Sequence, residues 1–334
     1  MLVAVENGSA ELFRSSGACK RRKLAHSLGG FVASPIYWAL AHWYCVPGLY
    51  LQRYCSLLGV ELALKKRADV PYYLLYRSLR DSLRSTRYLE FDFVWKRLLH
   101  RQTLGFYLDV SSPRLLPLLL LRRRTPDRAL ILNAEPAEVA ITATLIAAAG
   151  LGERYNTVCC TPEAVQFGPE SFDVITSIGG IGRMKEDSRT VATLWQWLKP
   201  GGTLLMSLSC AAQPREYRDQ CLEGWQSDGE EKCVFQRVYD TELLNEHILE
   251  VLGEPSRAVI YGEISAGSLR KRSYLEKGNL GYCNWREPLL IGKKWRCFPS
   301  VGELPGEGVI VLEFTKPRTS YVAYVERPAF GMTA

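Results

Sequence analysis

The stretch that decides the fold is ESFDVITS at residues 170–177, followed by WLKPGGTLL at residues 197–205. The apolar core of the first stretch is typical of a strand buried on both faces. In the second, the Pro-Gly-Gly turn ends a helix and lets a strand begin without a long loop. The residues between them, 188–198, predict the connecting helix. A strand, a helix and a strand in this order predict a parallel pair joined by a right-handed crossover.

The same alternation extends in both directions along the chain. Strands are expected at residues 104–110, 129–133, 156–160, 172–177, 203–208, 257–264 and 308–315, and helices at 113–121, 137–149, 188–198 and 241–252. Residues 265–306 carry no clear periodicity and are expected to be a loop inserted between the last two strands. The predicted fold class is therefore α/β, with a seven-stranded, Rossmann-like sheet that is mainly parallel and has an antiparallel edge strand.

The rest of the chain is expected to flank this domain, which spans residues 101–318. Residues 1–25 are polar and predict a disordered or frayed terminus, and 319–334 a C-terminal tail. Residues 26–100 predict a helical N-terminal segment, with helices over 31–64 broken near Pro35 and Pro47, and further helix over 70–100.

Residues 24–52 contain no Lys, Arg, Asp or Glu, and a basic cluster precedes them. That length is formally enough to span a membrane, but Gly, Pro and His residues interrupt the stretch. Its Tyr and Trp side chains suit a membrane interface, a lid over a substrate pocket or a helical cap equally well. No secretory signal is apparent at the start, so we expect a cytoplasmic protein in which peripheral membrane contact through residues 24–52 stays open.

Charge and cysteine usage exclude several classes of function. The 42 Lys and Arg residues exceed the 35 Asp and Glu residues, for a net charge of +7. The basic runs lack interleaved aromatic residues, so they are interpreted as solvated faces and no nucleic-acid partner is expected. The ten cysteines form no C-x-x-C pair and no zinc-like spacing with the four histidines. We expect free thiols and no metal site.

Ligands of an open parallel sheet bind outside the carboxyl ends of its strands. Asp109, Ser111, Ser112 and Pro113 follow the first expected strand. Ser112 is a good N-cap and Pro113 a good first helical residue, so free N–H groups there would favour a carboxylate or phosphate. A capped helix without a ligand explains the same residues.

Further candidates follow the next three strands. Glu135 lies 26 residues beyond Asp109 and could accept hydrogen bonds from ribose hydroxyls, or simply cap the helix that follows. The candidates that would flank a nucleoside or line a glycine loop are Thr161, Glu163, Gln166 and Phe167 after the third strand, and Ser177, Ile178 and Gly179 after the fourth.

Together these pieces resemble the class I S-adenosylmethionine-dependent methyltransferase family over residues 87–317. The most specific matches are the two stretches at 170–177 and 197–205, and RYLEF at 87–91 and RVYD at 237–240 are similar to bacterial members. The resemblance implies bound S-adenosylmethionine, with its methionine end over residues 109–113, its ribose on Glu135 and its adenine near residues 161–167. The substrate would then face the loop at 177–183 and the N-terminal helices.

The chain departs from the family pattern at three places. The usual Gly-x-Gly-x-Gly loop is Ser111-Ser112-Pro113, and a serine can replace the first glycine only at a negative φ. Thr161 stands where relatives carry an acid beside the adenine, with Glu163 as a stand-in. Many relatives carry a Glu-His pair after the fourth strand, where this chain has three glycines.

The expected activity is methyl transfer to a small-molecule, saccharide or lipid-linked acceptor. A base is needed only if the nucleophile must lose a proton. His100, Tyr239 and His247 are weak candidates for that base, and a purely structural role is the alternative for each of them. One alternative is a catalytically silent methyltransferase-like binding or scaffold protein. A dinucleotide-dependent oxidoreductase is disfavoured because no Gly-x-Gly-x-x-Gly follows the first strand.

Overall fold

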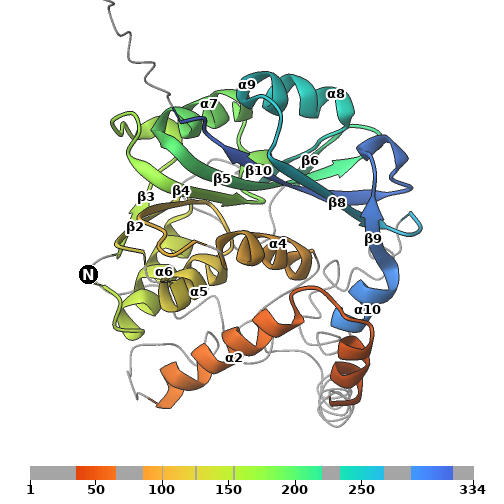
Figure 1. Ribbon diagram of the computed structural model, residues 1–334, viewed down its shortest axis with the longest axis horizontal. Helices are drawn as coiled ribbons and strands as arrows, with labels where there is room; N and C mark the ends of the chain where they lie inside the picture. Colours follow the sequence, from red (N-terminus) through yellow and green to blue (C-terminus); the bar gives the residue numbers. More distant parts are fainter. Residues whose placement is uncertain are drawn as a thin grey trace, which may run out of the picture.

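A computed structural model describes residues 35–64, 86–99, 101–124, 126–152, 155–219, 234–266 and 287–318. At its centre lies an eight-stranded sheet in the order β3-β2-β1-β4-β5-β10-β8-β9 (Figure 1). Its strands are β1 (Phe106–Val110), β2 (Arg128–Asn133), β3 (Tyr155–Cys159), β4 (Phe172–Ile178), β5 (Leu198–Ala211), β8 (Arg257–Glu263), β9 (Trp295–Phe298) and β10 (Glu307–Thr315). A separate antiparallel hairpin is formed by β6 (Arg215–Asp219) and β7 (Val234–Val238).

Strands β1 to β5 of the large sheet are parallel, whereas β10 pairs antiparallel with both β5 and β8. The prediction of a mainly parallel α/β sheet with antiparallel strands at one side is confirmed. All seven expected strands are present, with shifts of a few residues at their ends.

The expectation of a featureless loop over residues 265–306 is wrong in its second half. The helix α10 (Glu287–Lys294) and the strand β9 lie there, and β9 pairs antiparallel with the outer edge of β8. A four-residue strand is too short to show a period of two, and its pairing depends on an edge that only the folded sheet provides. The inserted segment therefore extends the sheet.

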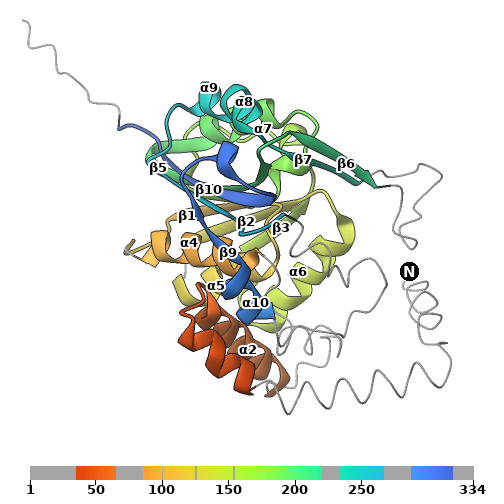
Figure 2. The ribbon, with the colours of Figure 1, turned by 90° about the vertical axis from the view of Figure 1, so that its right-hand side faces the viewer.

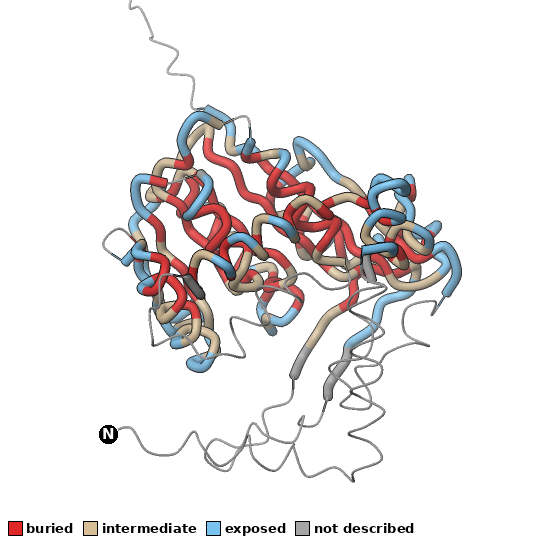
Figure 3. The backbone as a smooth tube through the Cα atoms, turned by 90° about the horizontal axis from the view of Figure 1, so that it is seen from below, coloured by how far each residue is buried: buried red, intermediate tan, exposed pale blue. Residues whose placement is uncertain are grey.

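Helices cover both faces of the sheet in two layers (Figures 1 and 2). On one face lie α4 (Arg87–Leu99), α5 (Leu115–Arg124) and α6 (Pro136–Ala148). On the other lie α7 (Asp187–Trp197) and a helical run made of α8 (Thr241–Leu244), a π-helical turn (Asn245–Leu249) and α9 (Glu250–Leu252). In α7 the buried Val191, Leu194 and Trp197 recur at helical spacing and face the sheet. Two buried apolar clusters result, one on each face (Figure 3).

Helix is present in the described parts of the predicted N-terminal segment, and residues 26–34, 65–85 and 100 lie outside the described residues. A helix over residues 35–43 is followed by a turn and by α2 (Leu49–Leu64), which packs below α4 and α5. The break near Pro47 is confirmed, and Gly48 takes a positive φ of 74° there while its N–H donates to Asp92 at 3.1 Å. A Cβ on Gly48 would lie 2.0 Å from the Tyr88 carbonyl oxygen, so only glycine fits.

None of the helices in the described part of the chain is both long and apolar enough to cross a bilayer. The predicted terminal segments, 1–25 and 319–334, lie outside the described residues.

Candidate functional site

The order in which the chain adds strands to the sheet reverses between β1 and β4. From β1 the chain proceeds to β2 and β3 on one side, and from β4 it proceeds to β5 on the other. Such a switch point opens a crevice at the carboxyl ends of the strands, where ligands of open α/β sheets bind. The residues that follow β1, β2 and β4 therefore define the candidate site.

Asp109 lies in β1, one residue before its carboxyl end, and is fully buried. Its carboxylate accepts hydrogen bonds from Thr176 Oγ1 at 2.6 Å, Tyr107 Oη at 3.1 Å and the Ser112 N–H at 3.2 Å. Burial raises the pKa of Asp109 to about 6, although the bonds from Thr176, Ser112 and Tyr107 act in the opposite direction. The predicted site residue Asp109 thus joins β1 to β4 beneath the crevice.

This raised pKa predicts a pH-dependent stability. The folded protein holds the Asp109 proton more tightly than the unfolded chain, so the stabilisation is present below pH 4 and is lost as the pH rises through about 6. The rise of the Asp109 pKa from about 4 to about 6 corresponds to roughly 3 kcal/mol in the free energy of unfolding. Urea unfolding between pH 4 and 7 should show that decline for the wild type and a flatter profile for Asp109→Asn. Parallel profiles for the two proteins would contradict this assignment.

The turn after β1 differs from the predicted one in two ways. Ser111 adopts the left-handed region, with a φ of 56°, although a negative φ was expected for a serine that replaces glycine. That conformation costs roughly 1–2 kcal/mol for a residue with a side chain. The helix begins at Leu115, so Ser112 and Pro113 do not cap it as predicted.

Instead, the serine side chains connect β1 to β4. Ser112 Oγ accepts a hydrogen bond from the Ile178 N–H at 2.9 Å, and Ser177 Oγ donates to the Val110 carbonyl at 2.9 Å. Ser112, Ser177 and Ile178 are all buried. These three predicted site residues therefore support the crevice from below, and any contact with a ligand stays a prediction.

Two arginines, one from the loop after β4 and one from α4, lie beside the ends of β1 and β4. Arg183 donates from Nε to the Gly179 carbonyl at 3.1 Å and from Nη2 to the Ser111 carbonyl at 3.3 Å. Arg87, from α4, donates to Glu90 at 2.7 Å and to the Ile178 carbonyl at 3.4 Å. Gly179 has a φ of 67°, and a Cβ there would lie 2.8 Å from both terminal guanidinium nitrogens of Arg87. Glycine is required at this position by its neighbour as well as by its backbone.

Glu135 lies at the other side of the crevice, immediately before α6. It is half-buried, does not cap the helix, and its carboxylate receives no hydrogen bond or ion pair from any described residue. Its neighbour Glu138, by contrast, pairs with Arg114 at 2.5 Å across the gap between α5 and α6. Among the described residues Glu135 is therefore an acceptor without a donor, and its binding of ribose hydroxyls stays a prediction.

The residues predicted to flank an adenine do not all face the crevice. Glu163 accepts a hydrogen bond from Thr190 of α7. Phe167 packs against Trp197, with ring centroids 4.8 Å apart. Thr161 and Gln166 are exposed beside β3. Glu163 and Phe167 thus contact α7, and a ligand contact of Thr161 and Gln166 stays a prediction.

Two of the weak catalytic candidates meet at one buried carboxylate. Tyr239 Oη donates to Asp187, whose other oxygen lies 2.9 Å from His247 Nδ1, and Arg237 forms an ion pair with the same carboxylate. Asp187 is 1% exposed. This Asp187 cluster joins the start of α7 to β7 and the helical run after it, directly behind the loop that carries Arg183. His100 lies outside the described residues.

Sequence reasoning missed the residues that organise the site. Arg183, Arg87 and Asp187 were not candidates, because each acts through a contact between distant parts of the chain. The one local signal was the lone Arg183 at the end of a loop with three glycines. Groups of His, Cys, Asp and Glu able to hold a metal ion are absent from the described residues.

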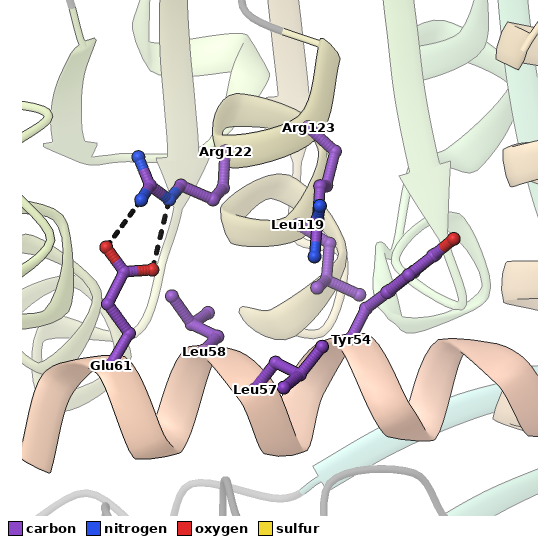
Figure 4. Close-up of a pocket in the computed structure, with 7 residues that line it drawn as sticks. All are labelled: Tyr54, Leu57, Leu58, Glu61, Leu119, Arg122 and Arg123. Atoms are coloured by element: carbon purple, nitrogen blue, oxygen red, sulfur yellow. Dashed lines mark hydrogen bonds and ion pairs between the residues drawn. The ribbon is translucent and has the colours of Figure 1, made fainter.

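A cavity of about 170 Å³ lies elsewhere, between α2 and α5 (Figure 4). Tyr54, Leu57 and Leu58 line it from α2, and Leu119 lines it from α5. Arg122 and Glu61 form an ion pair at its rim, with 2.5 Å between Nη2 and Oε1. The cavity does not include any of the predicted site residues.

Comparison with known proteins gives one family match. Residues 108–206 match the family described as a methyltransferase domain. A search of curated proteins returns no significant match.

Several solved structures are similar to this chain at low identity. They include the [4+2]-cyclase SpnF, at 17% identity over 68% of this chain and 80% of that chain, with a TM-score of 0.43. The YcgJ protein from Bacillus subtilis is 12% identical over 69% of this chain and 99% of its own, with a TM-score of 0.44. Geranyl diphosphate C-methyltransferase from Streptomyces coelicolor A3(2) is 10% identical over 69% and 77%, with a TM-score of 0.45. These values are too low to transfer a ligand or a substrate.

The matched residues run from β1 through β5 and contain the switch point described above. They include the two stretches that resembled the family in the sequence. The similarity shown for this chain is therefore to a methyltransferase domain over residues 108–206.

Proposed function

We propose that this protein binds S-adenosylmethionine in the crevice at the ends of β1, β2 and β4 and transfers its methyl group to an acceptor. The proposal rests on two sets of hydrogen-bond acceptors that lie at these strand ends. One is the Glu135 carboxylate, which no described residue engages. The other is the pair of carbonyls of Ser111 and Gly179, which already accept hydrogen bonds from a cation.

The residues at this edge fit the chemistry of the cofactor. A half-buried carboxylate without a partner suits two ribose hydroxyls, as in other nucleotide-binding sheets. Two carbonyl oxygens suit an ammonium, and the guanidinium of Arg87 suits a carboxylate. The left-handed turn at Ser111 directs its carbonyl to the crevice in the same way that a glycine would.

The cofactor, when bound, supplies an electrophilic methyl group on a sulfonium. The chain has to hold that methyl in line with the acceptor and exclude water. We assign the holding to Glu135 and the Ser111 and Gly179 carbonyls, and the exclusion of water to the N-terminal helices and the loop after β4. Tyr239 and His247 support that loop through Asp187, and a direct role in proton transfer stays a prediction.

The acceptor is proposed to be a small molecule, a saccharide or a lipid-linked compound. Among these three classes, the exposed side chains of the described residues support a lipid-linked compound most specifically. Large apolar side chains are exposed along residues 36–60, among them Ile36 at 62%, Trp43 at 84% and Leu57 at 55%. Arg53 and Lys293 lie beside this surface, stacked on Trp38 and Tyr44.

Peripheral membrane contact through this surface predicts a measurable difference between lipids. The protein should co-sediment with vesicles that contain phosphatidylglycerol and much less with pure phosphatidylcholine. Replacing Trp43 with alanine should weaken that partitioning about tenfold, because one large aromatic side chain no longer enters the interface. Leu99→Ala, an exposed apolar residue on α4, serves as the control. Equal sedimentation of wild type and Trp43→Ala would contradict the contact.

A catalytically silent, methyltransferase-like binding protein is the second candidate. Three observations favour it: the Ser111–Pro113 turn in place of glycines, Arg183 over two carbonyls of the crevice, and Glu163 turned toward Thr190. A dinucleotide-dependent oxidoreductase has no comparable support.

Titration calorimetry separates these candidates. We expect S-adenosylmethionine and S-adenosylhomocysteine to bind with similar micromolar affinity and dinucleotides not to bind. No binding of either sulfur nucleoside at millimolar concentration would favour the silent protein. Preferential binding of a dinucleotide would overturn the assignment.

A further inference from the structure

Arg183 makes a contact that the catalytic fold does not require. Its guanidinium connects the carbonyl of Ser111, at the end of β1, to the carbonyl of Gly179, at the end of β4. Ser111 comes directly after β1 and Gly179 directly after β4, the two strands between which the strand order reverses. Both residues have a positive φ. Two oxygens from separate strands thus converge on one positive charge inside the crevice.

Arg183 forms no ion pair with a carboxylate of the described residues. Its residue is exposed, and burial of the guanidinium together with the like charge of Arg87 lowers its pKa, although the more distant Glu138 and Glu90 act in the opposite direction. Glu90 is already paired with Arg87, and Glu138 with Arg114. Two hydrogen bonds to neutral carbonyls hold an exposed side chain only weakly, so the guanidinium can swing away from the crevice.

We propose that Arg183 is an internal competitor for the amino-acid end of the cofactor. Its guanidinium occupies the two carbonyls that would otherwise accept the cofactor's ammonium group, and it must leave before the ammonium can bind. The inference rests on the proposed function, because it assigns a regulatory residue to the same crevice. No covalent step is involved: one cation replaces another on the same pair of oxygens.

The competition predicts an unusual result for a binding-site arginine. Arg183→Ala should bind S-adenosylhomocysteine about five- to tenfold more tightly, the factor that corresponds to losing the two weak hydrogen bonds. Methylthioadenosine has the same nucleoside but no amino-acid moiety, so its affinity should change less than twofold. Arg189→Ala, which removes an exposed arginine paired with Glu186 on α7, should affect neither ligand.

Two readouts distinguish the outcomes. Calorimetry gives the affinities, and ¹⁵N NMR follows the Nε–H of Arg183, which should exchange more quickly with water when S-adenosylhomocysteine displaces it. Weaker binding of S-adenosylhomocysteine by Arg183→Ala would overturn the inference and make Arg183 a partner of the cofactor carboxylate. Unchanged affinity for S-adenosylhomocysteine, with methylthioadenosine bound equally well by both proteins, would overturn it while leaving the proposed function intact. Failure of both ligands to bind either protein would overturn the two together.

Discussion

Replacing Asp187 with alanine is expected to lower the free energy of unfolding by about 3–5 kcal/mol. The carboxylate is 2% exposed and receives Tyr239, His247 and Arg237. Its removal leaves the buried Tyr239 phenol without its acceptor and takes from Arg237 its buried carboxylate partner, with Glu216 still 3.6 Å from the guanidinium. Urea unfolding at pH 7 measures the change.

The neighbouring residue provides a matched control. Glu186 carries the same charge and pairs with Arg189, but both side chains are more than 60% exposed. Glu186→Ala should therefore change the free energy of unfolding by less than about 0.5 kcal/mol. An equal, small effect of both substitutions would show that the Asp187 cluster does not hold α7 against β7.

The pH dependence of this cluster is opposite to that of Asp109. Burial raises the pKa of Asp187, but the hydrogen bonds from Tyr239, Arg237 and His247 outweigh burial, and its pKa is lowered overall. Its stabilisation is thus present above the ordinary aspartate pKa of about 4 and is lost as the pH falls below it. Asp187 thus loses its stabilisation below about pH 4, whereas Asp109 loses its stabilisation between about pH 4 and 6.

Replacing Glu135 with alanine is expected to weaken S-adenosylhomocysteine binding roughly 100-fold. A carboxylate that accepts from two ribose hydroxyls makes two charge-assisted bonds, each worth about 1.5 kcal/mol or more. The fold should not change, because no described residue depends on the Glu135 side chain. Calorimetry with wild type and variant gives the ratio, and equal thermal unfolding of the two proteins confirms that the fold is intact.

A second variant tests whether the charge alone matters. Glu254 lies exposed in the turn after α9, so Glu254→Ala removes one negative charge far from the crevice. Its affinity for S-adenosylhomocysteine should match that of the wild type within twofold. If Glu135→Ala binds as tightly as Glu254→Ala, the ribose is not at the end of β2.

Much of the fold could be predicted because its signals are local. Apolar runs such as residues 172–178 determine strands within a few residues of sequence. The Pro-Gly-Gly turn was misplaced, because residues 200–202 lie inside β5, where the pairing with β4 shifts register. The strand β9 was missed because four residues carry no period and need an existing edge to pair with. The start of α5 was also misplaced, because Ser112 binds the Ile178 N–H in place of the helix end.

The site was harder to predict because its contacts join distant residues. Glu135 could be located from its position after a strand, and no described residue binds its carboxylate. The contact of Arg183 with Ser111 spans 72 residues, and that of Asp187 with His247 spans 60. Neither pair has a sequence pattern, since each depends on how the ends of separate elements meet. The left-handed Ser111 is a further example, because the turn after β1 imposes a conformation that serine itself disfavours.

The most direct test of this account is a crystal structure of the protein with S-adenosylhomocysteine. We predict electron density for the nucleoside at the carboxyl ends of β1 and β2, with the ribose hydroxyls on the Glu135 carboxylate and the ammonium on the carbonyls of Ser111 and Gly179. Arg183 should be turned away from both carbonyls. A nucleoside bound elsewhere, for example in the cavity between α2 and α5, with Arg183 still over the crevice, would contradict it.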